Sequence, residues 1–233
     1  MPIAAASVRA IPSGMRYATA IVLALAAATL VPLPGCASTG IAVRESLGYA
    51  KREQLVDRVE DARDEQAEAK EQFATTLDEF KALTNFDGGN LEKTYNKLKR
   101  EYERSRDAAG DVSGRIESVE RVANAMFSEW ERELAEFSSD SFRRASERQL
   151  IDTRDRYNTL LSAMQRAESR MDPVLDLFGD QVLFLKHNLN ARAIGSLDAT
   201  VGELDDEIDR LIAEMNTSIE EADAFIEELG TAS

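Results

Sequence analysis

Apolar residues recur along most of this chain in alternating steps of four and three, and this spacing constrains the fold more than any other feature. The pattern continues without a break from Leu91 to Trp130, and shorter runs cover residues 55–83, 153–178 and 197–229. Such spacing keeps one face of a slightly underwound α-helix against a partner. Strands would require a period of two residues, which the chain does not show. We therefore predict an all-α protein.

Two clear turns separate the runs. The sequence Asn85–Asn90 (NFDGGN) is rich in turn-forming residues, and Asn90 is placed to cap the helix that follows. Ser138–Ser141 predicts a second turn, with Asp140 or Ser141 as the cap. Short connections make neighbouring helices antiparallel. The expected fold is an elongated antiparallel helical bundle or coiled coil.

The number of helices stays open between three and four. Pro173 lies where the four-and-three phase continues unchanged, so we expect a kink rather than a helix end. Residues 188–196 fit either a third turn or a continuous helix. Two positions of the first run, Gln66 and Thr76, are polar lapses in the apolar seam.

The N-terminal segment has the features of a secretory signal. Arg9 and Arg16 precede an uncharged apolar stretch, residues 18–31, which is too short to span a bilayer comfortably. We expect residues 1–35 to be cleaved from the mature protein. The alternative is a short membrane anchor that is retained, but Pro32 and Pro34 disfavour a longer helix.

The only cysteine, Cys36, directly follows this segment in Leu33-Pro34-Gly35-Cys36. These four residues resemble the bacterial lipobox, although Pro34 departs from its usual pattern. The resemblance implies that Cys36 is acylated and becomes the new N-terminus, and Ala37 after it implies the periplasmic face of the outer membrane. The alternative is ordinary secretion to a soluble periplasmic or extracellular location.

These expectations divide the chain into three parts. They are a lipoprotein-type signal peptide over residues 1–35, a short tether of small residues over 36–43, and a long helical bundle domain over 44–233.

Charge excludes some partners and suggests others. The chain has 28 basic and 43 acidic residues, a net charge of −15, which argues against nucleic-acid binding. Residues 142–170, which include Arg143, Arg144 and Arg148, carry a net +3, whereas residues 197–233 carry a net −11. The two segments are expected to pack as neighbours; alternatively, the arginine-rich segment binds anionic lipid or glycan.

The residues needed for common catalytic sites are scarce. One His and one Cys exclude a structural zinc site built by this chain alone, and a di-iron bundle needs two Glu-x-x-His pairs. No phosphate-binding loop, H-E-x-x-H or G-x-S-x-G sequence occurs. We expect no enzyme activity, no cofactor and no metal.

Residues 180–194 stand apart from the seam. Val182–Leu185 is apolar on every helical face, so we expect it to be covered on several sides. The only histidine, His187, is expected to be a hydrogen-bonded core residue. Phe184, His187 and Asn188 are nevertheless candidate contacts for a ligand or partner.

Three segments together, residues 85–93, 141–150 and 181–191, resemble an uncharacterised family of bacterial envelope proteins that is catalogued only as a domain of unknown function. The resemblance implies a predominantly helical, coiled-coil-like protein, often with a lipoprotein signal. It implies no activity, cofactor or catalytic residue.

Two functions fit these expectations. The first is a lipid-anchored structural, scaffold or adaptor protein of the cell envelope, whose helical faces bind a second copy or another envelope protein. The second is a periplasmic module that holds a lipid or other amphiphile between helices near Phe184 and His187. The first predicts exposed seam positions and an oligomer, and the second predicts a monomer with an internal cavity.

Overall fold

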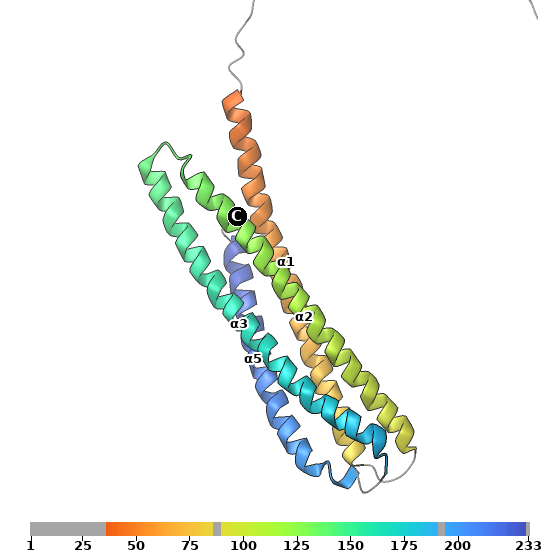
Figure 1. Ribbon diagram of the computed structural model, residues 1–233. Helices are drawn as coiled ribbons and strands as arrows, with labels where there is room; N and C mark the ends of the chain where they lie inside the picture. The colour runs from red at the N-terminus through yellow and green to blue at the C-terminus, as the bar shows by residue number, and fades with distance from the viewer. Residues whose placement is uncertain (1–35, 86–89, 191–193, 232–233) are drawn as a thin grey trace, which may run out of the picture.

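Four long helices run alternately up and down a narrow bundle (Figure 1). The computed structural model describes residues 36–85, 90–190 and 194–231, with side-chain surroundings described from residue 51 onward. The helices are α1 (Cys36–Thr84), α2 (Leu91–Leu134), α3 (Asp140–His187) and α5 (Asp198–Thr231). With no strand in the described ranges, the prediction of an all-α antiparallel bundle is confirmed. A helix of α1's 49 residues is about 70 Å long.

The helices form a square in which each packs against two others. α1 contacts α2 and α5, and α3 contacts the same two helices from the opposite corner. Ion pairs mark the closing α1–α5 interface: Lys81 Nζ lies 2.6 Å from Asp205 Oδ1, and Arg63 Nη1 lies 2.9 Å from Asp223 Oδ1. The first and last helices are therefore direct neighbours.

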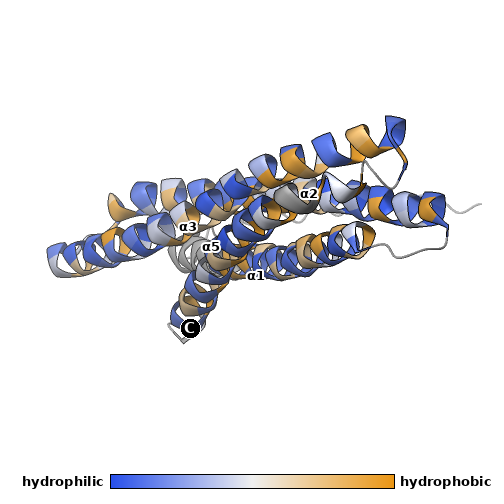
Figure 2. Ribbon diagram, turned by 90° about the horizontal axis from the view of Figure 1, so that it is seen from below, coloured by the Kyte–Doolittle hydropathy of each residue, from blue (hydrophilic) through white to orange (hydrophobic). Residues whose placement is uncertain are grey.

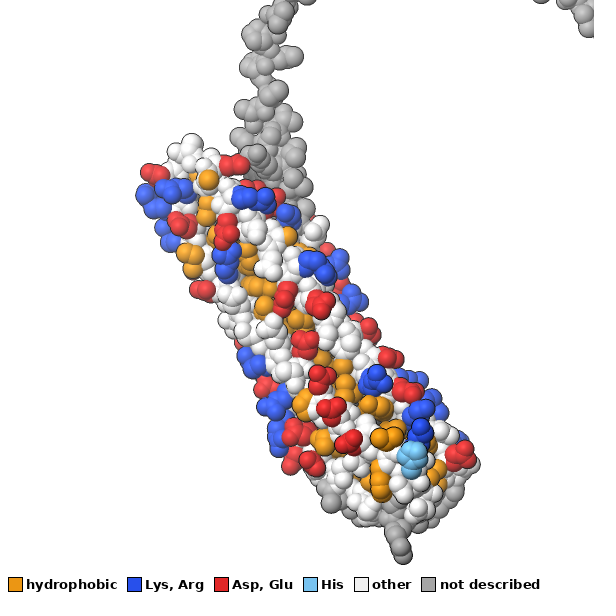
Figure 3. All heavy atoms as spheres, viewed as in Figure 1, with side chains coloured by type: hydrophobic (Ala, Val, Ile, Leu, Met, Phe, Trp, Pro, Cys, Tyr) orange, Lys and Arg blue, Asp and Glu red, His pale blue; other side chains and the backbone are white. Residues whose placement is uncertain are grey.

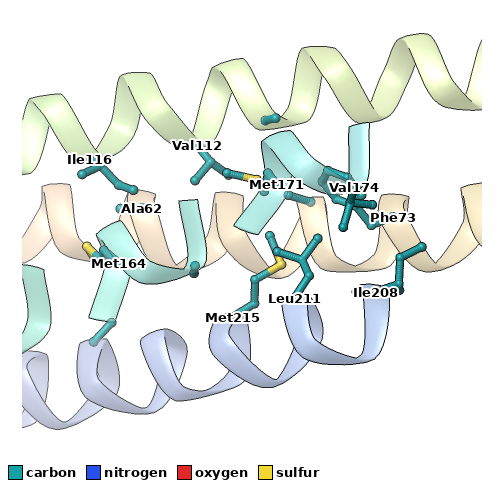
Figure 4. Packing of buried hydrophobic residues seen from close by; sticks show 14 of the residues in the cluster. Ala62, Phe73, Val112, Ile116, Met164, Met171, Val174, Ile208, Leu211 and Met215 are labelled. Carbon is teal, nitrogen blue, oxygen red and sulfur yellow. The ribbon is translucent and has the colours of Figure 1, made fainter. Parts of the chain in front are cut away.

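Each helix buries one apolar stripe along the bundle axis. Viewed from below, hydrophobic and hydrophilic residues alternate around every helix (Figure 2). The core is continuous from Leu55 to Leu229, and in close view side chains from all four helices converge in it (Figure 4). Phe80 and Phe178 meet edge to face, with ring centroids 6.3 Å apart. The seam predicted from the sequence is thus filled largely within one chain.

Both polar lapses lie inside the core, but their surroundings differ. Thr76 on α1 is fully buried, and its hydroxyl lies 2.8 Å from Ser105 Oγ and donates to Glu101 O at 3.1 Å. Gln66, also fully buried, has no hydrogen-bond partner for either side-chain polar atom, and neither has the hydroxyl of Ser218 on α5. The buried hydroxyl of Thr76 therefore has hydrogen-bond partners, whereas the buried amide of Gln66 and the buried hydroxyl of Ser218 have none.

Both turns lie where the sequence predicted them, but one of the two helix N-caps differs from the prediction. Asn90 caps α2, with its side-chain oxygen accepting from Lys93 N at 3.0 Å, as predicted; residues 86–89 lie outside the described part. At the second turn the N-cap of α3 is Ser139, and not Asp140 or Ser141 as predicted, and Ser139 makes no side-chain cap hydrogen bond.

The two open questions about helix number are answered by α3. This helix passes through Pro173 and ends at His187, and the chain turns before α5 begins at Asp198. Four long helices are therefore present, and the proline does not end one.

The start of α1 differs from the expected tether. Residues 36–43 are helical and form the first turns of α1, so the helix begins eight residues earlier than predicted. Small residues such as Ala37 and Ala42 are compatible with a helix, and the one glycine there, Gly40, weakens it by only about 1 kcal/mol. The expected signal segment, residues 1–35, lies outside the described residues. None of the described helices has an apolar stretch sufficient to cross a membrane.

Candidate interaction surfaces

Large apolar side chains left outside the core gather near the two ends of the bundle. Phe142 is 68% exposed, and Phe137 and Ile151 are also exposed, on the α2–α3 hairpin. Leu183 and Phe184 are exposed at the opposite end, where α3 finishes. The chain therefore offers two candidate contact surfaces rather than one long exposed seam.

The α2–α3 hairpin extends beyond the last turn of α5. Glu228, near the C-terminal end of α5, forms an ion pair with Arg156 of α3, so the part of α3 that precedes Arg156 continues past α5. Figure 1 shows the α2–α3 turn projecting beyond the C-terminal end of the chain. No side chain from Asp140 to Gln149 is buried, and Leu150 is the first buried residue of α3. We call residues 131–151 the α2–α3 tip.

Trp130 forms the base of this tip. Its indole Nε1 donates to Ser146 Oγ at 2.8 Å, which joins α2 to α3. The guanidinium carbon of Arg52 on α1 lies 5.9 Å from the indole ring centroid, and Lys51 Nζ lies 2.6 Å from Glu129 Oε2. α1 therefore still contacts the hairpin at this level, on the way to its own N-terminus.

Below Trp130, Tyr157 lies in a well-covered layer of the bundle. Its ring packs edge-on against Phe127, with centroids 5.5 Å apart, and the side chain is 5% exposed. Burial, and to a smaller extent the negative charge of Glu120, raise the pKa of Tyr157 to about 12.

The arginine-rich segment divides where α5 ends. Arg156 and Arg166 form ion pairs with Glu228 and Glu214 of α5, so this part of α3 lies beside the acidic helix. The three candidate residues Arg143, Arg144 and Arg148 are exposed and lie beyond it.

Within the tip, these three arginines have few acidic partners. Arg143 Nη2 lies 3.0 Å from Asp140 Oδ1 of its own first turn. Among the side chains that the structure describes, Arg144 and Arg148 form no ion pair. Their guanidinium groups are available to solvent or to a partner.

The opposite end corrects two expectations. Val182 and Leu185 are buried, but Leu183 and Phe184 are 56% and 40% exposed, so this apolar stretch is covered on one side only. Among the described residues, the helices that cover α3 at this position lie on its inner side, and adjacent residues of a helix point in different directions. His187 is exposed and is not a core residue. Figure 3 shows the histidine at the end of the bundle with apolar and basic side chains close by.

The candidate contacts at this end lie on the surface. Asn188 caps α3, its backbone N–H donating to Phe184 O at 3.1 Å and its Nδ2 donating to the same oxygen at 3.0 Å. An amphiphile bound near Phe184 and His187 would thus lie against the outside of the bundle, not between helices. In the ranges the structure describes, no group of three or more His, Cys, Asp or Glu could hold a metal ion.

Sequence reasoning missed Phe137, Phe142 and Ile151. A signal for them was present, because the third apolar run begins only at Thr153, more than ten residues after the turn. A helix that continues without a seam has no bundle partner there.

The fold and these surfaces define an elongated, single-chain four-helix bundle with a protruding helical hairpin. The chain matches the family model described as a protein of unknown function, DUF2959, over residues 41–229, and it belongs to that family. The expected resemblance to an uncharacterised helical family is therefore confirmed. No protein with a curated description and no solved structure is detectably similar to the chain.

Proposed function

We propose that this protein is a lipid-anchored rod of the bacterial cell envelope with a non-enzymatic scaffold or adaptor role. The observation that carries the proposal is the position of Cys36. It directly follows a basic and apolar signal-like segment, and it is also the first residue of α1. Acylation there joins the membrane to one end of a helix about 70 Å long.

The arrangement of exposed residues supports an adaptor more than a self-associating coiled coil. Seam positions that would drive association, such as Phe73, Val119 and Leu211, are fully buried within one chain. The apolar contact surface at Leu183 and Phe184 lies at the end of the rod opposite Cys36. A partner bound there is held away from the membrane by the length of the bundle.

Metabolic labelling with palmitate tests the anchor. The wild-type protein is expected to incorporate label and to fractionate with outer membranes, and Cys36→Ser to lose both properties. A Cys36→Ser protein that still carries label, or an unlabelled wild type in the soluble fraction, contradicts the proposal.

Light scattering and lipid mass spectrometry of residues 44–233 test the competing amphiphile-binding function. A rod whose core is filled by its own side chains is expected to be a monomer without stoichiometric lipid. Monomers that carry one lipid per chain would favour the amphiphile-binding module instead.

A further inference from the structure

We propose that Gln66 of α1 and Ser218 of α5 form a polar layer in the core that fixes the register of α5 along the bundle. Both side chains are fully buried, and their polar atoms have no hydrogen-bond partner among the described residues. Single polar residues in the seam of a coiled coil can fix its register at a cost in stability. The inference goes beyond the scaffold role, and it does not depend on the lipid anchor.

The first step is that chain connectivity does not set this register. α5 follows α3 after residues 188–197, and the other helix that it contacts, α1, is far away in sequence. The ten connecting residues can span about 33 Å, whereas sliding a helix by one heptad moves it about 10 Å. The register of α5 is therefore set by the helix faces that it contacts.

The second step is the alignment of α1 with α5. Arg63 Nη1 lies 2.9 Å from Asp223 Oδ1, and Lys70 Nζ donates to Asn216 Oδ1 at 3.1 Å. Seven residues separate the two contacts on each helix, so the helices run in step between them.

The Gln66–Ser218 layer lies between these two contacts. Gln66 follows Arg63 by three residues on α1, and Ser218 follows Asn216 by two on α5. Since both side chains are buried, they share one level of the core. At one level, a direct hydrogen bond or a single bridging water can serve both polar groups.

The ion pairs with α3 do not select this register, because the acidic side of α5 repeats. Glu214 and Glu228 of α5 pair with Arg166 and Arg156 of α3. They belong to a series of glutamates spaced by seven residues, namely Glu207, Glu214, Glu221 and Glu228. If α5 slid by one heptad toward the α2–α3 tip, each arginine would again meet a glutamate of this series.

The contacts with α1 are similarly tolerant. After the same slide Lys70 would meet the carboxylate of Asp209 in place of the amide of Asn216, and an ammonium group binds a carboxylate more strongly. Exposed ion pairs in any case add little to stability. Heptad spacing also keeps apolar residues opposite apolar residues, so most of the seam would accept the slide.

The buried polar pair would not accept it. After the slide Gln66 would face Leu211, and Ser218 would face Val59. The two polar groups would then lie about 10 Å apart along the axis, each among apolar side chains. A buried amide and a buried hydroxyl that cannot share a partner both oppose folding. The layer therefore favours the observed register over the shifted one.

The register determines which part of α3 stays accessible. The end of α5 is level with Arg156. A slide of about 10 Å would carry this end over part of the exposed segment from Asp140 to Gln149. By fixing the register, the polar layer keeps this segment open.

The test reads the register with two introduced thiols and a short bifunctional thiol crosslinker. The full chain carries Cys36→Ser, so that no other thiol is present. Arg63→Cys with Asp223→Cys reports the observed register. Arg63→Cys with Asn216→Cys reports the slide toward the tip.

Each thiol pair is placed in three cores. The first is the original core, and the second is an apolar core with Gln66→Leu and Ser218→Ala. The third is a matched control with Thr76→Val and Ser105→Ala, which removes a buried polar pair from the α1–α2 interface instead. Circular dichroism melting verifies that each protein is folded.

Only the apolar core is expected to show the slide. Because it removes the penalty of separating two buried polar groups, the crosslinking yield of the shifted pair is expected to rise about tenfold over that of the original core. An unchanged yield would overturn the proposal. An equal rise in the matched control would also overturn it, since the effect would then come from a loosened core.

A second measurement asks whether the two groups act together, and it needs no introduced thiol. Denaturant midpoints are compared for Gln66→Leu, Ser218→Ala and the double change. Groups that share one hydrogen bond or one water are expected to give midpoint shifts that do not add. Additive shifts would mean that the two residues act independently, and would contradict a common layer.

Discussion

The helices α2 and α3 run through both the middle of the bundle and the α2–α3 tip, yet their side chains have different surroundings in the two regions. Around Met164 and Met171 of α3, four helices meet and the apolar side chains are almost fully buried. From Asp140 to Gln149 the same helix has no buried side chain. The difference lies in the neighbours, because α5 covers the first stretch and ends before the second. Beyond the end of α5, the side chains of α3 lose one neighbouring helix and stay accessible to solvent.

The comparison is tested most strongly by removing one aromatic ring from each region. Phe73→Ala in the core is expected to lower the free energy of unfolding by about 3–5 kcal/mol, because it loses apolar burial and leaves a cavity. Phe142→Ala at the tip is expected to change it by about 0.5 kcal/mol or less. Urea unfolding followed by circular dichroism measures both. A comparable loss from Phe142→Ala would mean that the tip is packed as the core is.

The two polar lapses of α1 provide the next test, within the core itself. Gln66→Leu is expected to raise the free energy of unfolding by about 1–2 kcal/mol, because it replaces a buried amide that has no partner. Thr76→Val is expected to lower it by about 1–2 kcal/mol, because it removes the hydroxyl that pairs with the buried Ser105 Oγ. Denaturant midpoints that move in the same direction for both variants would refute the distinction between the partnered Thr76 and the unpartnered Gln66.

The helix caps extend the comparison to the chain turns. Asn90→Ala removes a side-chain cap at the far end and is expected to cost about 1 kcal/mol. Ser139→Ala at the tip removes no cap hydrogen bond, so a cost of only a few tenths of a kcal/mol is expected. Thermal melting resolves the two, and an equal loss would indicate that Ser139 caps α3 in solution.

Substitution of Tyr157, which lies near the boundary between the two regions, is expected to change the free energy of unfolding least at neutral pH. Its folded-state pKa of about 12 lies above the unfolded value of 10, so the phenol stabilises the fold fully below pH 10 and this contribution is lost as pH rises toward 12. Tyr157→Phe is expected to remove that part of the alkaline destabilisation and to change little at neutral pH. Phenolate absorbance, compared between wild type and variant, measures the titration directly, and a phenol that ionises near pH 10 would show the layer to be open to water.

The repeat spacing and the turn-forming residues predicted an all-α antiparallel bundle, but they left the number of helices open between three and four. Steps of four and three select one helical face, and the turn-forming residues before Asn90 and around Ser139 fix where each helix ends. Even the polar seam residues Gln66 and Thr76 are buried, because their register and not their polarity determines which way they face. The spacing could not predict the hydrogen bonds. Thr76 and Ser105 bond only because the two residues lie at the same height along the α1–α2 interface.

The surfaces were harder to predict because exposure depends on helices distant in sequence. Leu183 and Phe184 have the composition of a core segment, and only the absence of a neighbour on their outer side exposes them. Arg143 and Arg166 belong to one basic segment, yet the length of α5 places only Arg166 beside an acidic side chain of α5. The residues of α3 alone do not show where α5 ends.

The packing of α1 against α5 also constrains the order in which the helices can fold together. Arg63 and Asp223 are 160 positions apart, so two segments separated by about two-thirds of the chain must meet before the four-helix arrangement is complete. During synthesis, the apolar face of α1 cannot be fully covered until α5 has left the ribosome. Contacts between residues so far apart in sequence also slow folding. A stop codon ahead of α5 would therefore uncover one side of both α1 and α3, so its effect on stability is expected to exceed the loss of the contacts within α5 itself.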